Sequence, residues 1–164
     1  MTTWVPAYIG IGSNIGDSLA QVRAAFDSLA ALPQCRLVAR SRLYRTRPFG
    51  PVSQGDFINA VAGLLTLLSA PDLLAALRGV EAAAGRVRAE RWGPRTLDLD
   101  LLVFGSERIA TAELTVPHPG IAERGFVLAP LADVAPTLKV PGSARVEQLL
   151  RALPDTGIAE VIAA

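Results

Sequence analysis

The most constraining feature of this chain is an alternation of leucine and aspartate within one short segment. Residues 97–102 are Leu-Asp-Leu-Asp-Leu-Leu. Because successive side chains of a strand point to opposite faces, Asp98 and Asp100 share one face and the leucines beside them share the other. The segment therefore predicts a core strand with one apolar face and one face that carries two carboxylates.

Two neighbouring carboxylates on a core strand cost free energy unless a positive charge lies between them. Magnesium fits this requirement, because it binds one or two carboxylates and takes water and phosphate oxygens as its other ligands. A half-exposed strand with solvated aspartates is the alternative. The spacing of Asp98 and Asp100 alone leaves both interpretations open.

An arginine cluster lies just before the aspartates. Arg86, Arg88, Arg91 and Arg95 fall within ten positions, and the glycines and proline around them predict a loop. The planar guanidinium group suits phosphate oxygens, and Trp92 could cover a base or ring. Carboxylates for a metal beside arginines for phosphate are what phosphoryl transfer requires. A solvated basic loop is the alternative.

Few other reactive side chains are present. The chain has one histidine (His118), one cysteine (Cys35) and one lysine (Lys139), and the other 15 of its 16 basic residues are arginine. Zinc sites built from Cys and His are excluded. A phosphate-binding Gly-Lys-Ser/Thr loop is excluded, and no Gly-x-Ser-x-Gly nucleophile motif occurs. The chemistry therefore falls to Asp, Glu and Arg.

Apolar periodicity predicts a single domain over residues 1–164. The expected elements are a strand at 7–12, a helix at 18–32, strands at 36–46 and 57–68, a helix from the Ser69 cap to Ala84, a strand at 96–104 that turns into a partner strand at 108–110, and helical pieces at 120–134 and 144–152. This mixed order indicates the α+β class, with helices packed on one sheet.

Three further features allow a structural or a functional interpretation. Residues 10–16 resemble a dinucleotide fingerprint, but the third glycine is one residue late, so we expect a tight turn with an Asn or Asp cap and no ligand. His118 is held in an extended conformation by the next proline, and a lone histidine is more often structural. Phe57, Phe126 and Asn59 could hold a flat polar heterocycle, although the residues alone favour core positions for the two rings.

Charge and composition bear on partners and compartment. The net charge of +1 and the pI of about 8.0 give no argument for nucleic acid. No apolar run reaches the ~18 residues of a membrane span, and the first residues lack the pattern of a signal peptide. Since Cys35 has no cysteine partner within the chain, we expect a reducing, cytoplasmic location.

Several motifs together resemble 6-hydroxymethyl-7,8-dihydropterin pyrophosphokinase, an enzyme family of folate synthesis. The resemblance spans roughly residues 7–135. The matching segments are Tyr8-Ile-Gly-Ile-Gly-Ser-Asn-Ile-Gly-Asp17, Tyr44-x-Thr46-x-Pro48-x-Gly50, Phe57-Ile-Asn59, Arg86-Val-Arg88, Arg91-Trp-Gly-Pro-Arg-Thr-Leu-Asp-Leu-Asp100, Val116-Pro-His-Pro119 and Arg124-Gly-Phe-Val-Leu-Ala-Pro130.

The resemblance implies a ferredoxin-like α+β fold, a three-layer αβα arrangement with an antiparallel sheet. It also implies transfer of pyrophosphate from ATP to the pterin hydroxymethyl group, with release of AMP. ATP and a pterin are the expected partners of a monomer that binds neither nucleic acid nor membrane. One departure is Arg78, which stands where a relative has glutamine near the nucleotide.

The resemblance also implies roles for individual residues. Two magnesium ions would bind Asp98 and Asp100, and these aspartates with Arg86 and Arg95 would form the catalytic set. The ATP contacts would be Glu81, Arg86, Arg88, Trp92, Arg95, Thr115, His118 and Arg124. The pterin contacts would be Thr46, Pro48, Phe49, Phe57, Asn59 and Phe126.

Two rival functions remain open at the level of sequence. One is another magnesium-dependent nucleotide enzyme, such as a hydrolase or an adenylyl transferase, with the same two carboxylates. The other is a ferredoxin-like binding module without catalysis, for a small ligand or for RNA. The first rival predicts different products, and RNA binding predicts a steep salt dependence.

Overall fold

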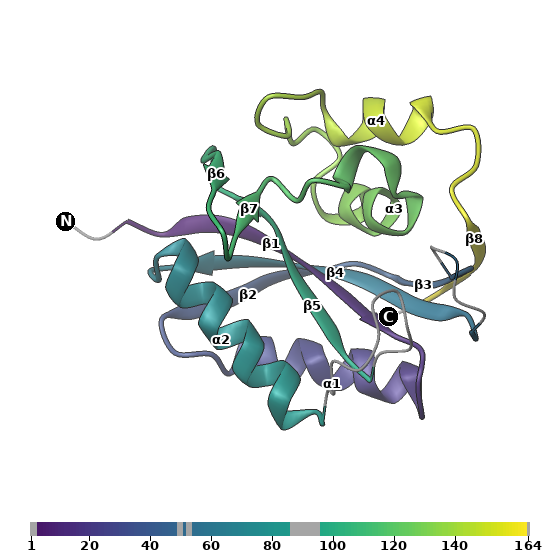
Figure 1. Cartoon of the computed structure of the whole chain (residues 1–164), viewed down its shortest axis with the longest axis horizontal. Coiled ribbons are helices and arrows are strands. Elements are labelled where there is room, and N and C mark those ends of the chain that lie inside the picture. Colours follow the sequence, from purple (N-terminus) through teal and green to yellow (C-terminus); the bar gives the residue numbers. More distant parts are fainter. Residues whose placement is uncertain (1–2, 49–50, 52–53, 86–95, 164) are drawn as a thin grey trace.

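The centre of the molecule is an antiparallel sheet (Figure 1). The computed structural model describes residues 3–48, 51, 54–85 and 96–163. The strands of the sheet are β1 (Val5–Ser13), β2 (Cys35–Arg40), β3 (Leu43–Thr46), β4 (Phe57–Thr66), β5 (Asp98–Phe104) and β8 (Ile158–Ile162). Their order is β5-β1-β4-β3-β8, and β2 also pairs with β4. Strand β5, which carries the aspartates, therefore has β1 as its strand partner.

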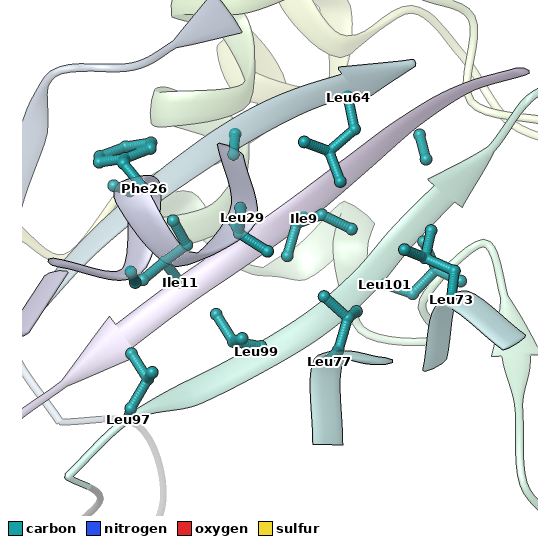
Figure 2. Close-up of a cluster of buried hydrophobic side chains, with 14 of the residues drawn as sticks. Ile9, Ile11, Phe26, Leu29, Leu64, Leu73, Leu77, Leu97, Leu99 and Leu101 are labelled. Atoms are coloured by element: carbon teal, nitrogen blue, oxygen red, sulfur yellow. The ribbon is translucent and has the colours of Figure 1, made fainter. Parts of the chain in front are cut away.

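One face of the sheet is covered by α1 (Ser18–Ala30) and α2 (Ala70–Ala83), as Figure 1 shows. The leucines of β5 point into this layer and lie near Leu73 and Leu77 of α2, in an apolar cluster that also contains Phe26 of α1 (Figure 2). Both helices begin at predicted caps. Asp17 accepts a hydrogen bond from the Ala20 N–H, and Ser69 accepts one from the Asp72 N–H.

The opposite face is covered at one end by α3 (Gly125–Val134) and α4 (Val146–Ala152). A 3₁₀ turn, η1 (Ile121–Glu123), precedes α3. Val61 and Leu102 of the sheet pack there against buried leucines of α3. The α+β class and the three-layer arrangement of helices around one sheet are thus confirmed. None of the helices in the described ranges is long and apolar enough to cross a membrane.

The strand predicted at 36–46 is wrong in its continuity, because it forms two strands, β2 and β3. Between them, the Ser41 N–H donates to the Val61 carbonyl at 3.0 Å, but the Val61 N–H donates to the Ser41 hydroxyl at 2.8 Å and not to a backbone carbonyl. The next N–H, of Arg42, donates to Asp133 of α3 and not to a strand. Side-chain acceptors therefore interrupt a run whose apolar pattern is continuous.

The partner predicted for the 96–104 strand is also wrong. Strand β6 (Ile109–Ala110) pairs with β7 (Thr115–Val116) in a separate two-stranded sheet. The Gly105 N–H donates to the Pro6 carbonyl at 2.8 Å, which carries the chain past the end of β1 instead of back along β5. Strand β8, which pairs with β3, was not predicted from the sequence.

Candidate active site

The two aspartates lie in register with glycines and with Asn59 across three strands. Asp98 is opposite Gly12 of β1, and Gly12 is in turn opposite Asn59 of β4. Asp100 is likewise opposite Gly10. Since paired residues of adjacent strands share a face, the carboxylates and Asn59 stand on either side of a row without side chains. This row is the floor of the candidate site.

The two glycines leave room that no other residue would. A Cβ atom at Gly12 would lie 2.9 Å from Asn59 Oδ1, and one at Gly10 would lie 3.3 Å from the Leu102 side chain. Both glycines lie inside β1, as the predicted strand at 7–12 requires, so the tight turn predicted for residues 10–16 forms only after Ser13. The predicted aspartate cap nearby, Asp17, is confirmed. The partners of the two glycines come from distant strands, so the sequence alone did not place them beside the aspartates.

Asp100 has an unfavourable electrostatic environment for a carboxylate. Burial and the charge of nearby Asp98 raise its pKa to about 7, while Arg78 and Arg124 act in the opposite direction. The two carboxylates therefore repel each other at neutral pH unless a cation joins them. The described part of the chain shows no group of three or more His, Cys, Asp or Glu side chains that could hold a metal. Two carboxylates suit magnesium when phosphate oxygens supply further ligands.

Asn59 is fixed by a buried hydrogen bond. Its amide nitrogen donates to the Thr46 hydroxyl at 2.6 Å, and both side chains are buried. The amide oxygen therefore points toward Gly12. Phe57, also next to Gly12, is only partly buried, as is Pro48. Thr46, Phe57 and Asn59 are thus brought together, which makes Phe57 an available ring and not a core residue.

Phe126 begins the other side of the site. It is partly buried on α3, packs against the apolar cluster that contains Val61, and has the Arg124 guanidinium carbon 5.8 Å from its ring centroid. Val61 is two residues from Asn59 on the same face of β4. The expectation that Phe126 is a core residue is therefore only half met, since one part of its ring stays accessible.

His118 is held beside β5 by its own backbone. Its N–H donates to the Leu102 carbonyl at 2.9 Å, and its Nδ1 accepts from the Gly120 N–H at 3.2 Å. Burial, followed by the charge of Arg124, lowers its pKa to about 4, although Asp98 acts in the opposite direction. The ring is therefore neutral at pH 7, and the bond at Nδ1 assigns the proton to Nε2.

Glu81 and Thr115 occupy different surroundings. Glu81 is 3% exposed, and its carboxylate accepts hydrogen bonds from the Leu99 N–H and from Arg78. Thr115 is exposed on β7, which lies against β5. The predicted ATP contacts of both residues stay predictions.

Five predicted site residues lie outside the described residues. They are Phe49, Arg86, Arg88, Trp92 and Arg95. Their assignments rest on the sequence alone. The described chain ends at Gly85 and begins again at Thr96, two residues before Asp98.

Known proteins resemble this chain over most of its length. A family model described as 7,8-dihydro-6-hydroxymethylpterin-pyrophosphokinase (HPPK) matches residues 8–136. The 2-amino-4-hydroxy-6-hydroxymethyldihydropteridine pyrophosphokinase of Pseudomonas aeruginosa is 48% identical over 151 residues, which are 92% of this chain and 93% of that protein. The protein of the same name from Methylorubrum extorquens is 44% identical over 155 residues, 94% of this chain and 98% of that one.

Solved structures agree on the fold. The crystal structure of wild-type Plasmodium falciparum HPPK-DHPS has a TM-score of 0.67 at 12% identity, and the match covers 92% of this chain. The match covers 45% of that longer chain. An HPPK-DHPS in complex with substrates also gives a TM-score of 0.67, at 11% identity, over 92% of this chain and 43% of that one. The expected ferredoxin-like fold is confirmed by these neighbours.

Proposed function

This chain belongs to the 7,8-dihydro-6-hydroxymethylpterin-pyrophosphokinase family, and from this premise we propose a role for each residue of the site. Its activity is the transfer of pyrophosphate from ATP to the hydroxymethyl group of 6-hydroxymethyl-7,8-dihydropterin. The products are AMP and the pterin diphosphate, in a step of folate synthesis. The observation that carries the assignment of the site is the row of Asp98, Gly12 and Asn59 across three strands.

Asp98 and Asp100 are the residues that hold two magnesium ions in this proposal. Their donor atoms are the hard oxygens that magnesium prefers, and a cation between them would offset the burial and the Asp98 charge that raise the pKa of Asp100. Bound magnesium supplies charge neutralisation at the phosphate oxygens. The protein itself holds the two carboxylates on the same face of one strand, with one residue between them.

Asn59 reads the edge of the pterin in this proposal. Its amide nitrogen is engaged by Thr46, so its oxygen stays an acceptor for a ring N–H group. Phe57 and Phe126 are partly buried rings that offer faces to a flat heterocycle, and Phe49 with Pro48 would complete the pocket. Holding the hydroxymethyl oxygen in line with the β-phosphorus is the largest contribution such residues make.

Cationic and neutral donors bind the phosphates of ATP in this proposal. Arg124 lies close enough to Asp100 and His118 to affect the pKa of both. His118 offers a neutral Nε2–H donor. Arg86 and Arg95 would offset the charge that develops on the phosphate oxygens, with Arg88, Trp92 and Thr115 as further ATP contacts.

Product analysis tests the function directly. With ATP, magnesium and the hydroxymethyl pterin, we expect AMP and pterin diphosphate in equal amounts. ADP with phosphate, or AMP with free pyrophosphate, would instead support the rival hydrolase, and free pyrophosphate with an adenylylated acceptor would support the rival adenylyl transferase. Asp98→Ala and Asp100→Ala should abolish transfer, whereas Asp27→Ala, which removes an exposed carboxylate 3.7 Å from Arg40, should leave it unchanged.

We also propose that the protein acts as a monomer in the cytoplasm. The support for the compartment is the single cysteine, which suits a reducing environment. Light scattering during gel filtration should give a mass near 17.2 kDa. A stable mass of twice that value would contradict the monomer.

A further inference from the structure

Strand β5 has an edge that faces away from β1, and this edge carries the backbone between the two aspartates. Leu99 is opposite Ile11 of β1. Its N–H and carbonyl oxygen nevertheless bond to side chains of α2, so both point away from β1. In an antiparallel pair the outward groups alternate from residue to residue, so the backbone groups of Asp98 and Asp100 turn toward β1.

Two side chains of α2 satisfy the outward groups of Leu99. Glu81 Oε2 accepts from the Leu99 N–H at 2.8 Å. Arg78 Nη1 donates to the Leu99 carbonyl at 3.2 Å and to Glu81 Oε1 at 2.9 Å. Arg78 and Glu81, three positions apart on the helix, therefore bond to both backbone polar groups of Leu99, as a neighbouring strand would.

The cost of this arrangement argues for a role beyond helix packing. The Glu81 side chain is only 3% exposed, and a buried carboxylate is expensive even when it is paired. Its charge also raises the pKa of Asp100, whereas that of Arg78 lowers it. The apolar contacts of Leu73 and Leu77 with the leucines of β5 already dock α2 on the sheet (Figure 2).

We propose that Arg78 and Glu81 are positioning residues that fix the direction of the Asp98 and Asp100 carboxylates through the backbone of Leu99. Each aspartate shares a peptide bond with Leu99, so a rotation of this backbone would turn both carboxylates. This inference rests on the proposed magnesium site. It replaces a direct ATP contact of Glu81 with an indirect role.

The test measures cation binding apart from turnover. Mn²⁺ binding in the presence of α,β-methylene-ATP is followed by electron paramagnetic resonance for the wild type and for Glu81→Ala, Glu81→Gln and Arg78→Ala. Groups that orient metal ligands typically change affinity by ~10–100-fold. We expect Glu81→Ala to weaken Mn²⁺ binding about 10-fold or more and to lower kcat similarly, with the KM for the pterin within about twofold.

Glu81→Gln should recover most of the Mn²⁺ affinity, because its amide oxygen can still accept from the Leu99 N–H. If Glu81 had only a structural role, its substitution would lower the free energy of unfolding. It would not weaken Mn²⁺ binding while leaving the KM for the pterin nearly unchanged. Asp27→Ala is the matched control, since it removes an exposed carboxylate on α1 that has an arginine partner. It should match the wild type in every measurement.

Two outcomes separate this inference from the proposed metal site. If Asp98→Ala binds Mn²⁺ as tightly as the wild type, the metal site itself is wrong. If Asp98→Ala loses Mn²⁺ while Glu81→Ala and Arg78→Ala keep it, the positioning role is overturned. Arg78 is 41% exposed, so Arg78→Ala keeps the test decisive if Glu81→Ala does not fold, with an expected loss of about threefold or more in Mn²⁺ affinity.

Discussion

At the scale of single residues, Gly12 is the position where one added methyl group would test the pterin site. In Gly12→Ala the Cβ would lie 2.9 Å from Asn59 Oδ1, so the amide must shift. We expect the KM for the pterin to rise about 10-fold, as for the loss of one well-placed contact of ~1.4 kcal/mol, with little change in the KM for ATP. Steady-state kinetics with each substrate varied would show this.

The control for this substitution is Gly79→Ala. Gly79 lies in α2, and a Cβ there meets nothing within 4 Å. It should leave both KM values unchanged and stabilise the helix by up to ~1 kcal/mol. If the KM for the pterin rose equally in both variants, the space above Gly12 would not be what the pterin requires.

His118 gives a prediction about pH that a single signal can test. Because it is the only histidine, its ring proton resonance follows one titration. We expect a midpoint near 4, since burial and Arg124 lower the pKa from 6.5. The folded state then binds fewer protons than the unfolded state between these values, so stability is complete above pH 6.5 and falls as the pH drops toward 4. A midpoint near 6.5 would show a solvated ring.

The residue scale also shows what the sequence could predict. Asp98 and Asp100 were found because their alternation with leucine is local. The bonds of Glu81 to Leu99 and of Asn59 to Thr46 join residues that are 18 and 13 positions apart. No local pattern encodes such pairs. They required the register of the sheet.

At the scale of elements, Tyr44 joins β3 to α3. Its hydroxyl donates to Asp133 at 2.8 Å, and burial followed by this hydrogen bond raises its pKa to about 12. Tyr44→Phe should lower the free energy of unfolding by about 1–2 kcal/mol, because Asp133 keeps its bonds to Arg42. Urea unfolding monitored by circular dichroism measures this. An unchanged midpoint would mean that Arg42 alone satisfies Asp133.

The helices were easier to predict than the strands for a physical reason. Helices α1 and α2 are specified by local caps and an apolar stripe, so their predicted starts agree with the structure. Strand β8 is a short segment that gains its stability from pairing with β3, more than 100 residues earlier. The break between β2 and β3 likewise depends on Val61 and Asp133, which the 36–46 segment does not contain.

At the scale of the whole molecule, the carboxylate pair that the proposed activity requires lowers the stability of the folded state. The folded pKa of Asp100, about 7, is above the unfolded value of 3.8, so the wild type loses stability as the pH rises through this range. Asp100→Asn mimics the protonated form. Without metal at pH 8 it should be more stable than the wild type by ~1–2 kcal/mol, with the advantage small at pH 4, and it should lack activity.

Thermal unfolding of both proteins at pH 8 and pH 4, with and without magnesium and an ATP analogue, measures this difference in stability. The analogue with magnesium should raise the midpoint of the wild type more than that of Asp100→Asn. Equal stabilisation of the two proteins by the ligands would argue against a metal role of Asp100. A wild type that is the more stable protein at pH 8 would argue against the carboxylate repulsion.

The bonds from α2 to Leu99 have a consequence for solubility as well. An uncovered sheet margin is a template on which other chains add as strands and aggregate. Here the outward N–H and carbonyl of Leu99 are already engaged by Glu81 and Arg78, so an incoming chain finds no free rung at that point. The same two side chains thus protect the edge of the strand that carries both aspartates against the addition of a foreign strand.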